Sequence, residues 1–183
     1  NVTFTGIVGG GTNGALGALT VNTTGTTTFS AAVTAASVTT NAGGTTAING
    51  GTITTTGAQT YNDAVTLGAA TTLTSSSSGN INLASTVNGA QTLTINTAGT
   101  TTFGGIVGGT TALTSITTDA AGSLAINGGA ITTTGAQTYN DAVTLGAATT
   151  LSASSITTGS TFNASSYAAT FTTDAIALGG NLS

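Results

Sequence analysis

The chain of 183 residues has no Lys, Arg, His, Cys, Met, Trp or Pro, and only 2% of its residues are charged. Its four acids are Asp63, Asp119, Asp141 and Asp174. Because proteins bind phosphate groups chiefly through Lys and Arg, the missing cations exclude nucleic acid as a partner and remove any attraction to anionic lipids. No segment approaches the roughly 20 consecutive apolar residues of a membrane-spanning helix, so we also expect no membrane insertion.

The missing residues also restrict chemistry. Catalysis by His, Cys or Lys is excluded, and a Ser or Thr nucleophile would need a neighbouring base. The absence of Cys and Met removes the commonest targets of oxidation, which suits a long-lived extracellular material. The chain begins at Asn1 rather than Met, and we interpret it as a mature or excised segment of a larger protein.

Threonine dominates what is present, at about a quarter of the chain. Hydrophobic residues make up 38% and mean hydropathy is +0.36, which argues against disorder. Thr, Val and Ile favour strands because their branched side chains pack well on a pleated surface. Short runs with an apolar residue at every second position predict strands with one buried face. They lie at 2–4, 19–21, 65–67, 81–83, 93–95, 124–126, 143–145 and 176–178.

An internal repeat organises these strands. Residues 48–73 and 126–151 differ only at Thr52 and Ala130, at an offset of 78. Residues 19–29 and 93–103 are also similar, at an offset of 74. The change of offset predicts a four-residue insertion within 108–113, in a Gly/Thr-rich loop where added length costs little. We therefore predict a single repetitive domain over 1–183, with units at about 19–92 and 93–170 and a divergent tail.

Two all-β architectures fit this pattern. In a parallel β-helix, or β-solenoid, short strands wind into coils of about 20–25 residues that stack at roughly 4.8 Å. In tandem Ig-like β-sandwiches, each unit would be one small domain. We favour the solenoid because Gly and Asn suit its corners, small aliphatic residues suit its interior, and Thr and Asn can stack in ladders from coil to coil.

The runs ITTTGAQTYNDAVTLGAATTL and LTINTAGTTTFGGIVGG resemble the strand repeats of very large bacterial surface proteins, the filamentous-haemagglutinin-like adhesins and their relatives. The resemblance covers about residues 1–151. It implies a right-handed parallel β-helix in a secreted or surface-anchored bacterial protein, with a role in a stalk, fibre or adhesive surface. It implies no catalytic residues.

The motif Tyr-Asn-Asp, which both units contain, supplies the candidate site residues. We interpret Asn62, Asp63, Asn140 and Asp141 as turn or ladder residues whose side chains bond nearby backbone groups, and a weak Ca²⁺ site is the alternative. Asp63 and Asp141 should lie three or four coils apart, too far for a catalytic carboxylate pair. We therefore predict no enzyme activity, no cofactor and no metal.

Tyr61 and Tyr139 are candidates for stacking on a host or matrix glycan, although a packing role is the commoner use of such a residue. Thr-X-Thr segments suggest ice binding through a flat Thr ladder, but the Thr positions do not share one strict register along the chain.

The lack of charge predicts association. Neither Lys nor Pro protects the strand edges, and an open solenoid end presents unpaired backbone groups. We expect an extracellular structural protein, part of a fibre, sheath or adhesin stalk that forms a homopolymer by end-to-end or lateral association. A ligand-binding adhesin passenger and an ice-binding protein are the alternatives.

Overall fold

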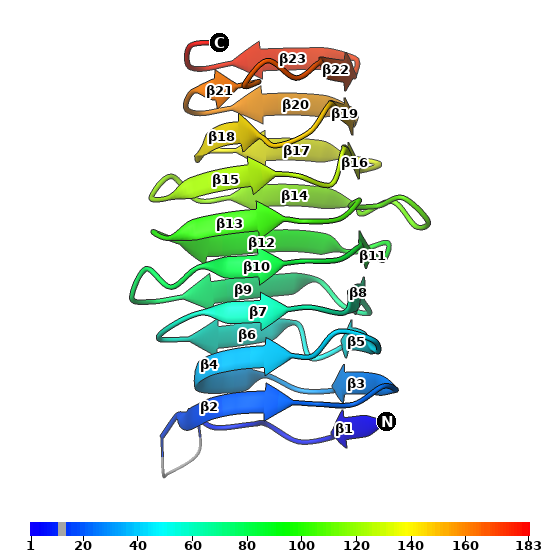
Figure 1. Ribbon diagram of the computed structural model, residues 1–183, viewed down its shortest axis with the longest axis vertical. Helices are drawn as coiled ribbons and strands as arrows, with labels where there is room; N and C mark the ends of the chain where they lie inside the picture. Colours follow the sequence, from blue (N-terminus) through cyan, green and yellow to red (C-terminus); the bar gives the residue numbers. More distant parts are fainter. Residues whose placement is uncertain (11–13) are drawn as a thin grey trace.

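In the computed structural model, which describes residues 1–10 and 14–183, the chain winds into a β-solenoid of about eight turns (Figure 1). The described residues form strands, turns and loops and contain no helix. Paired strands are parallel and belong to successive turns. The structure confirms the predicted solenoid, and the alternative of tandem sandwiches is wrong, because sandwich sheets are antiparallel.

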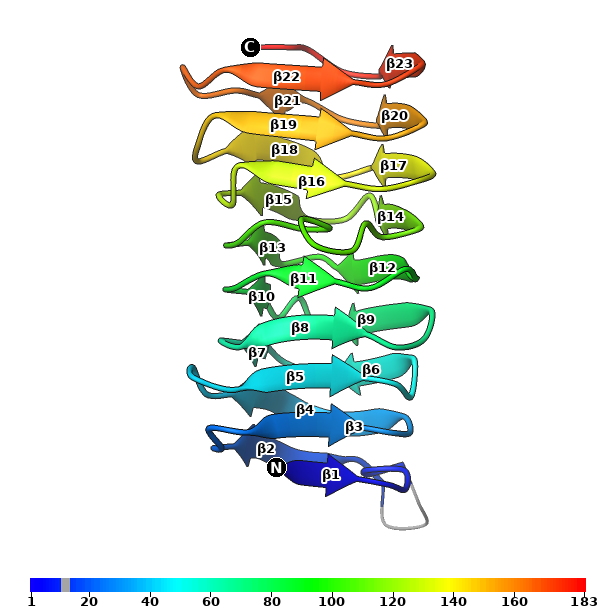
Figure 2. The same ribbon diagram turned by 90° about the vertical axis from the view of Figure 1, so that its right-hand side faces the viewer.

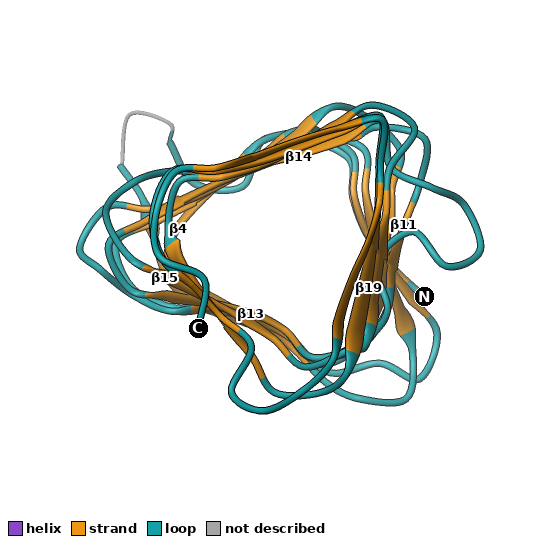
Figure 3. Ribbon diagram, turned by 90° about the horizontal axis from the view of Figure 1, so that it is seen from above, coloured by secondary structure: helices purple, strands orange, loops and turns teal. Residues whose placement is uncertain are grey.

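Each turn has three faces, which form a triangle when the molecule is viewed along its axis (Figure 3). We name the faces after β19, β14 and β13. The β19 face contains β1 (Val2–Phe4), β3 (Thr26–Phe29), β5 (Thr45–Ile48), β8 (Ala64–Leu67), β11 (Val87–Asn88), β16 (Ala130–Thr132), β19 (Thr149–Ser152) and β22 (Ala169–Thr172). Isolated bridges from Val107 to Val87 and to Ile131 join its two sheets.

The other two faces share one sheet of 15 strands that folds around a corner. The β14 face contains β6 (Thr52–Thr55), β9 (Thr71–Ser75), β12 (Thr92–Thr97), β14 (Ser115–Thr118), β17 (Ala136–Tyr139), β20 (Ser155–Thr158) and β23 (Ala175–Leu178). The β13 face contains β2 (Leu16–Val21), β7 (Gln59–Tyr61), β10 (Ile81–Leu83), β13 (Thr100–Phe103), β15 (Ser123–Ile126), β18 (Ala142–Leu145) and β21 (Phe162–Asn163). The long strand β4 (Val33–Thr40) turns the corner and pairs with β6 by its first half and with β7 by its second.

The chain passes from the β19 face to the β14 face, then to the β13 face, and then returns to the β19 face in the next coil. In Figure 2 the strands of the β19 face lie in front and run from left to right while the chain rises from the N-terminus to the C-terminus. The solenoid is therefore right-handed, the usual hand of parallel crossovers.

The core is the inside of the triangle, because alternate residues of each strand point inward. Buried and partly exposed residues accordingly alternate along most strands. Stacked strands place equivalent inward residues above one another, as in the row Tyr61, Leu83, Phe103 and Ile126 of the β13 face. Core side chains thus form continuous ladders along the axis rather than one compact cluster.

The corners require glycine at the Asn-Gly-Gly segments of both units. A Cβ atom on Gly50 would lie 2.2 Å from the carbonyl carbon of Ala31 in the previous coil. Gly51 and its equivalent Gly129 have φ of 74° and 79°, in the left-handed region that favours glycine. Close coil stacking and a sharp change of direction both depend on these positions.

The two near-identical units occupy different faces. β6 of the first unit lies on the β14 face, whereas the matching β16 of the second lies on the β19 face. Between them the chain takes eleven steps from face to face, which stop at β7, β8, β9, β10, β11, β12, β13, Val107, β14, β15 and β16. Because three steps make a turn, the second unit is rotated by one face relative to the first.

The predicted insertion forms a loop outside the triangle. Val107 and Leu113 make bridges within the wall, to Ile131 and Thr133, and residues 108–112 connect them. The β3-to-β13 step, before the insertion, and the β6-to-β16 step, across it, both span eleven faces. The four extra residues therefore add loop length without adding a face.

Candidate functional site

Asn62 and Asp63 lie at the corner between β7 and β8 and bond to the preceding coil. The Asn62 side-chain amide donates to the Thr40 carbonyl at 2.8 Å. Asp63 is buried, and its carboxylate accepts the Gly44 N–H at 3.0 Å and the Thr46 hydroxyl at 3.3 Å. These side chains therefore add bonds between successive coils at this corner, beside the backbone bond from the Asn62 N–H to the Thr40 carbonyl.

Asn140 and Asp141 lie at a different corner, between β17 and β18, where the chain passes from the β14 face to the β13 face. The Asn140 amide donates to the Thr118 carbonyl at 2.8 Å, and Asp141 Oδ1 accepts the Gly122 N–H at 2.9 Å. The second carboxylate oxygen, Oδ2, is buried without a hydrogen-bond partner. Its environment differs from that of Asp63 because Leu124 stands at the position in the preceding strand that Thr46 has in the first unit.

This environment changes the acidity of Asp141. Burial raises the pKa of its carboxyl above the ordinary value, and the negative charge of Asp119 acts in the same direction. The Gly122 N–H and the Thr118 hydroxyl, which lies nearby but outside hydrogen-bond geometry, lower the pKa and only partly offset the effect. Asp63 and Asp141 lie at different corners, so the repeat does not bring the two carboxylates into line.

Tyr61 and Tyr139 are fully buried in the core, which agrees with the favoured packing role and is against the alternative of stacking on a sugar. Each hydroxyl donates to the side chain of a buried glutamine two residues earlier, Gln59 or Gln137, at 2.9 Å. Burial raises the pKa of both phenols far above the ordinary value. The rings point inward because Tyr61 and Tyr139 share the strand alternation of their neighbours, and neither ring face is open to a ligand.

The two glutamines are the polar centre of a clamp that sequence reasoning missed. Gln59 Nε2 donates to the carbonyls of Ile53 and Thr74, at 3.2 and 2.9 Å, and the amide also reaches the Thr55 hydroxyl at 3.2 Å. Gln137 repeats the arrangement with Ile131, Ser152 and Thr133. The Gln-X-Tyr spacing was the available signal, since both residues fall on the same face of a strand.

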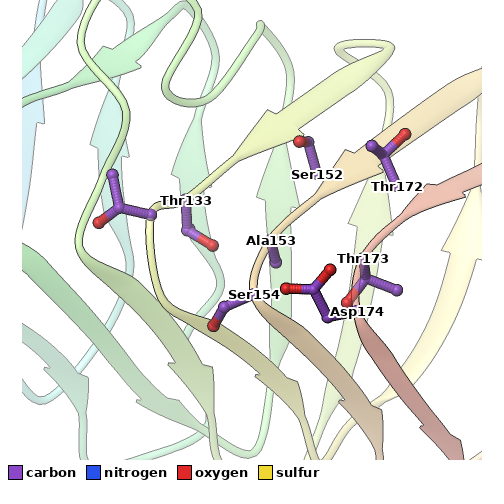
Figure 4. Close-up of a pocket in the computed structure, with 8 residues that line it drawn as sticks. Thr133, Ser152, Ala153, Ser154, Thr172, Thr173 and Asp174 are labelled. Carbon is purple, nitrogen blue, oxygen red and sulfur yellow. The ribbon is translucent and has the colours of Figure 1, made fainter.

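A shallow groove of about 460 Å³ crosses the last coils at the corner between the β19 and β14 faces (Figure 4). Its lining is mostly small and hydroxylated and is formed by Thr133, Thr134, Ser152, Ala153, Ser154, Thr172, Thr173 and Asp174. Asp174 is the only titratable group in this lining, so the groove offers no pair of groups for acid–base catalysis.

The described residues also contain no group of potential metal ligands and no long apolar helix. Among residues 1–10 and 14–183, no three His, Cys, Asp or Glu side chains gather where they could hold a metal ion. The same part of the chain has no helix of the length and hydropathy needed to cross a bilayer.

The ends of the solenoid carry most of the exposed apolar surface. Seven large hydrophobic side chains are exposed in the described chain: Ile7, Leu16, Ile106, Tyr167, Ile176, Leu178 and Leu182. Only Ile106 lies on the side of the solenoid, whereas the others belong to the first and last coils. The strands β1 and β2 at one end, and β22 and β23 at the other, pair on one side only. Each end therefore combines apolar side chains with free backbone groups.

Comparison with models of protein families, with curated proteins and with solved structures finds no match. The structure confirms the β-solenoid repeat architecture, and none of these comparisons shows a relation to bacterial adhesins.

Proposed function

We propose that this chain is a segment of an extracellular structural protein, a bacterial surface fibre, sheath or adhesin stalk of the filamentous-haemagglutinin-like kind, whose solenoids associate end to end. The observation that supports the proposal is that the first and last strands of this chain pair on one side only and carry exposed apolar side chains. The last strand, β23, exposes all four of its residues, including Ile176 and Leu178 at 47% and 38%. A second solenoid placed there would cover these side chains and continue the parallel ladder.

The two ends are suited to head-to-tail stacking. At the other end, Leu16 and Ile7 are 41% and 70% exposed, and β1 and β2 present the opposite edge of the ladder. Contact between two different surfaces of the same molecule does not close, so repetition produces a filament. The chain carries no Lys or Arg, so repulsion between like cations does not oppose the contact.

A concentration series of the full chain tests this proposal by light scattering after size exclusion and by negative-stain electron microscopy. We expect filaments one solenoid wide whose length increases with concentration. A chain that stays monomeric at every concentration would overturn end-to-end association.

A matched pair of substitutions locates the contact. Ile176→Lys places a charge on the end coil, whereas Ile106→Lys places the same charge on the side wall at a residue of similar exposure, 42% against 47%. We expect Ile176→Lys to abolish filaments and Ile106→Lys to retain them. The reverse result would show lateral rather than end-to-end association.

A further inference from the structure

A continuous column of threonines runs along the outside of the β14 face. Thr52 pairs in register with Thr72, Thr72 with Thr94, and Thr94 with Thr117. The column continues in register through two more coils, to Thr138 and then Thr157. Six successive coils therefore place a threonine at the same point, over about 24 Å at the normal strand spacing.

This register corrects the expectation that the threonines share no strict alignment. Register offsets between paired strands vary from 19 residues, as for Thr45 and Ala64, to 25, as for Val2 and Thr27. The variation is absorbed in corner loops outside the walls. Threonines that are irregularly spaced in the sequence consequently become regular in space.

Two short rows of hydroxyl side chains flank the column, one on each side. Thr34, Thr54 and Thr74 lie in register on one side in the early coils, and Thr92 pairs with Ser115 on the other side in the later coils. Within a strand, side chains two residues apart on one face are about 6.6 Å apart. The result is a hydroxyl-rich surface around the first four threonines of the column.

The other two faces have no comparable column. On the β13 face the row through Thr39 and Thr60 reaches Asn82 in the next coil, and Thr102 is followed by Ala125. On the β19 face Thr28 is followed by Ala47. Only the β14 face therefore keeps threonine at one position through six coils.

The column is accessible and its hydroxyls are free for a ligand. Four of its six threonines are half-buried, and Thr52 and Thr157 are exposed. Among the residues that the structure describes, none of the six hydroxyls makes a hydrogen bond to another protein group, whereas Thr26 and Thr45 on the β19 face bond to each other at 3.0 Å. Viewed along the axis, the strands of the β14 face lie nearly above one another (Figure 3), so the surface is close to flat.

We propose that the β14 face binds ice. Water oxygens in the crystal planes of hexagonal ice repeat at spacings close to those between coils and between alternate residues of a strand. Threonine methyl groups exclude disordered water while the hydroxyls hold water at fixed points, and a rigid wall imposes the lattice without an entropic cost of ordering long side chains. This inference does not depend on end-to-end association.

The two repeat units supply a matched pair of variants. Thr60 and Thr138 lie in the same sequence context, Gln-Thr-Tyr, and both side chains are half-buried. Thr138 belongs to the column, whereas Thr60 lies on the β13 face. A lysine at either site points to solvent, so both variants should fold, which circular dichroism and thermal unfolding would verify.

The experiment measures thermal hysteresis, ice-crystal shape and partitioning into slowly growing ice for the full chain. We expect the unmodified chain to shape ice and to enter it, Thr138→Lys to lose most of the hysteresis, and Thr60→Lys to retain it. Thr94→Val, which keeps the methyl group and the volume, should reduce activity less than Thr94→Lys. Absence of hysteresis in the unmodified chain, or equal losses at Thr60 and Thr138, would overturn the proposal.

Discussion

Residues 48–73 and 126–151 are almost identical in sequence, yet they build different walls of the solenoid. The first segment begins on the β14 face at β6, and the second begins on the β19 face at β16. Each keeps the same strands, corners and Gln–Tyr clamp. The sequence of a strand therefore does not decide which face of the solenoid it joins. That face depends on how many corners precede the strand along the chain.

The units also differ where each meets the coil below. The Asp63 carboxylate accepts a hydrogen bond from the Thr46 hydroxyl of the preceding coil. Leu124 stands at the equivalent position below Asp141, and one Asp141 carboxylate oxygen has no partner. Identical residues thus acquire different hydrogen-bond environments because the neighbouring coil differs in sequence. Internal duplication preserved the corner motif but not its partner.

The largest effect should come from breaking the clamps. Gln59→Leu and Gln137→Leu would each remove the donor to two buried carbonyls and leave a tyrosine hydroxyl without its acceptor. We expect each to lower the free energy of unfolding by about 3 kcal/mol, since each unsatisfied buried group costs on the order of 1–3 kcal/mol. Urea unfolding followed by circular dichroism measures the loss.

Near-equal losses for the two variants would support the view that the clamp works equally on either face. A difference greater than about 1 kcal/mol would show that the walls are not equivalent, since this exceeds the context effect of a typical hydrogen bond. Tyr167→Phe, at an exposed tyrosine in the last coil, is the control and should change little.

A smaller effect should distinguish the two aspartates. A carboxyl with a raised pKa in the folded state binds its proton more tightly when folded. Its stabilising contribution is therefore full below the ordinary carboxyl pKa and is lost as pH rises through the raised pKa. Asp141→Asn should remove this loss and, by offering an amide donor to the unpartnered Thr118 hydroxyl, stabilise the fold at neutral pH by about 1 kcal/mol.

Unfolding free energies from pH 3 to pH 8 would measure this effect. The matched variant Asp63→Asn should give no gain, because the Asp63 carboxylate already accepts from Gly44 and Thr46. A loss of stability in Asp141→Asn at neutral pH would contradict the assigned environment.

The smallest effect on stability should come from shortening the loop of the second unit to the length found in the first. Deletion of residues 108–111 removes four loop residues outside the wall and leaves Val107 and Leu113 in place. The N–H groups of Thr110 and Thr111 would no longer bond to Asn88, and the Gly89 N–H would lose the Thr111 carbonyl. We expect a change within about 1 kcal/mol because these groups can bond to water instead and loop length contributes weakly to stability. A loss of the folded state would show that the loop is needed to place the strands that follow it on their correct faces.

The fold was predictable because its signals are local. Alternating apolar residues such as Leu93 and Ile95 predict strands, and the Gly50–Gly51 pair predicts a corner. The insertion near 108–113 was also predictable, since the change of offset from 74 to 78 falls in a Gly/Thr-rich segment. The corner position of Asn62 and Asp63 follows in the same way from turn chemistry.

The surfaces were less predictable. A packing role for Tyr61 was predicted, but the partner of its buried hydroxyl, Gln59, was not, because the inward side of so short a strand is not marked in the sequence. The alignment of Thr94 with Thr72 and Thr117 depends on loops of unequal length that the sequence does not mark as coil boundaries.

The sequence by itself determined the absence of cations, the internal duplication, and which segments form strands and which form corners. Strand and corner preferences can be read from the sequence because they depend on residues only a few positions apart. Only the tertiary structure decided which face each strand occupies, which aspartate keeps an unpartnered oxygen and which threonines form a column. These properties depend on residues about 20 positions apart that meet one coil away, and their register is fixed by backbone ladders rather than by local preference.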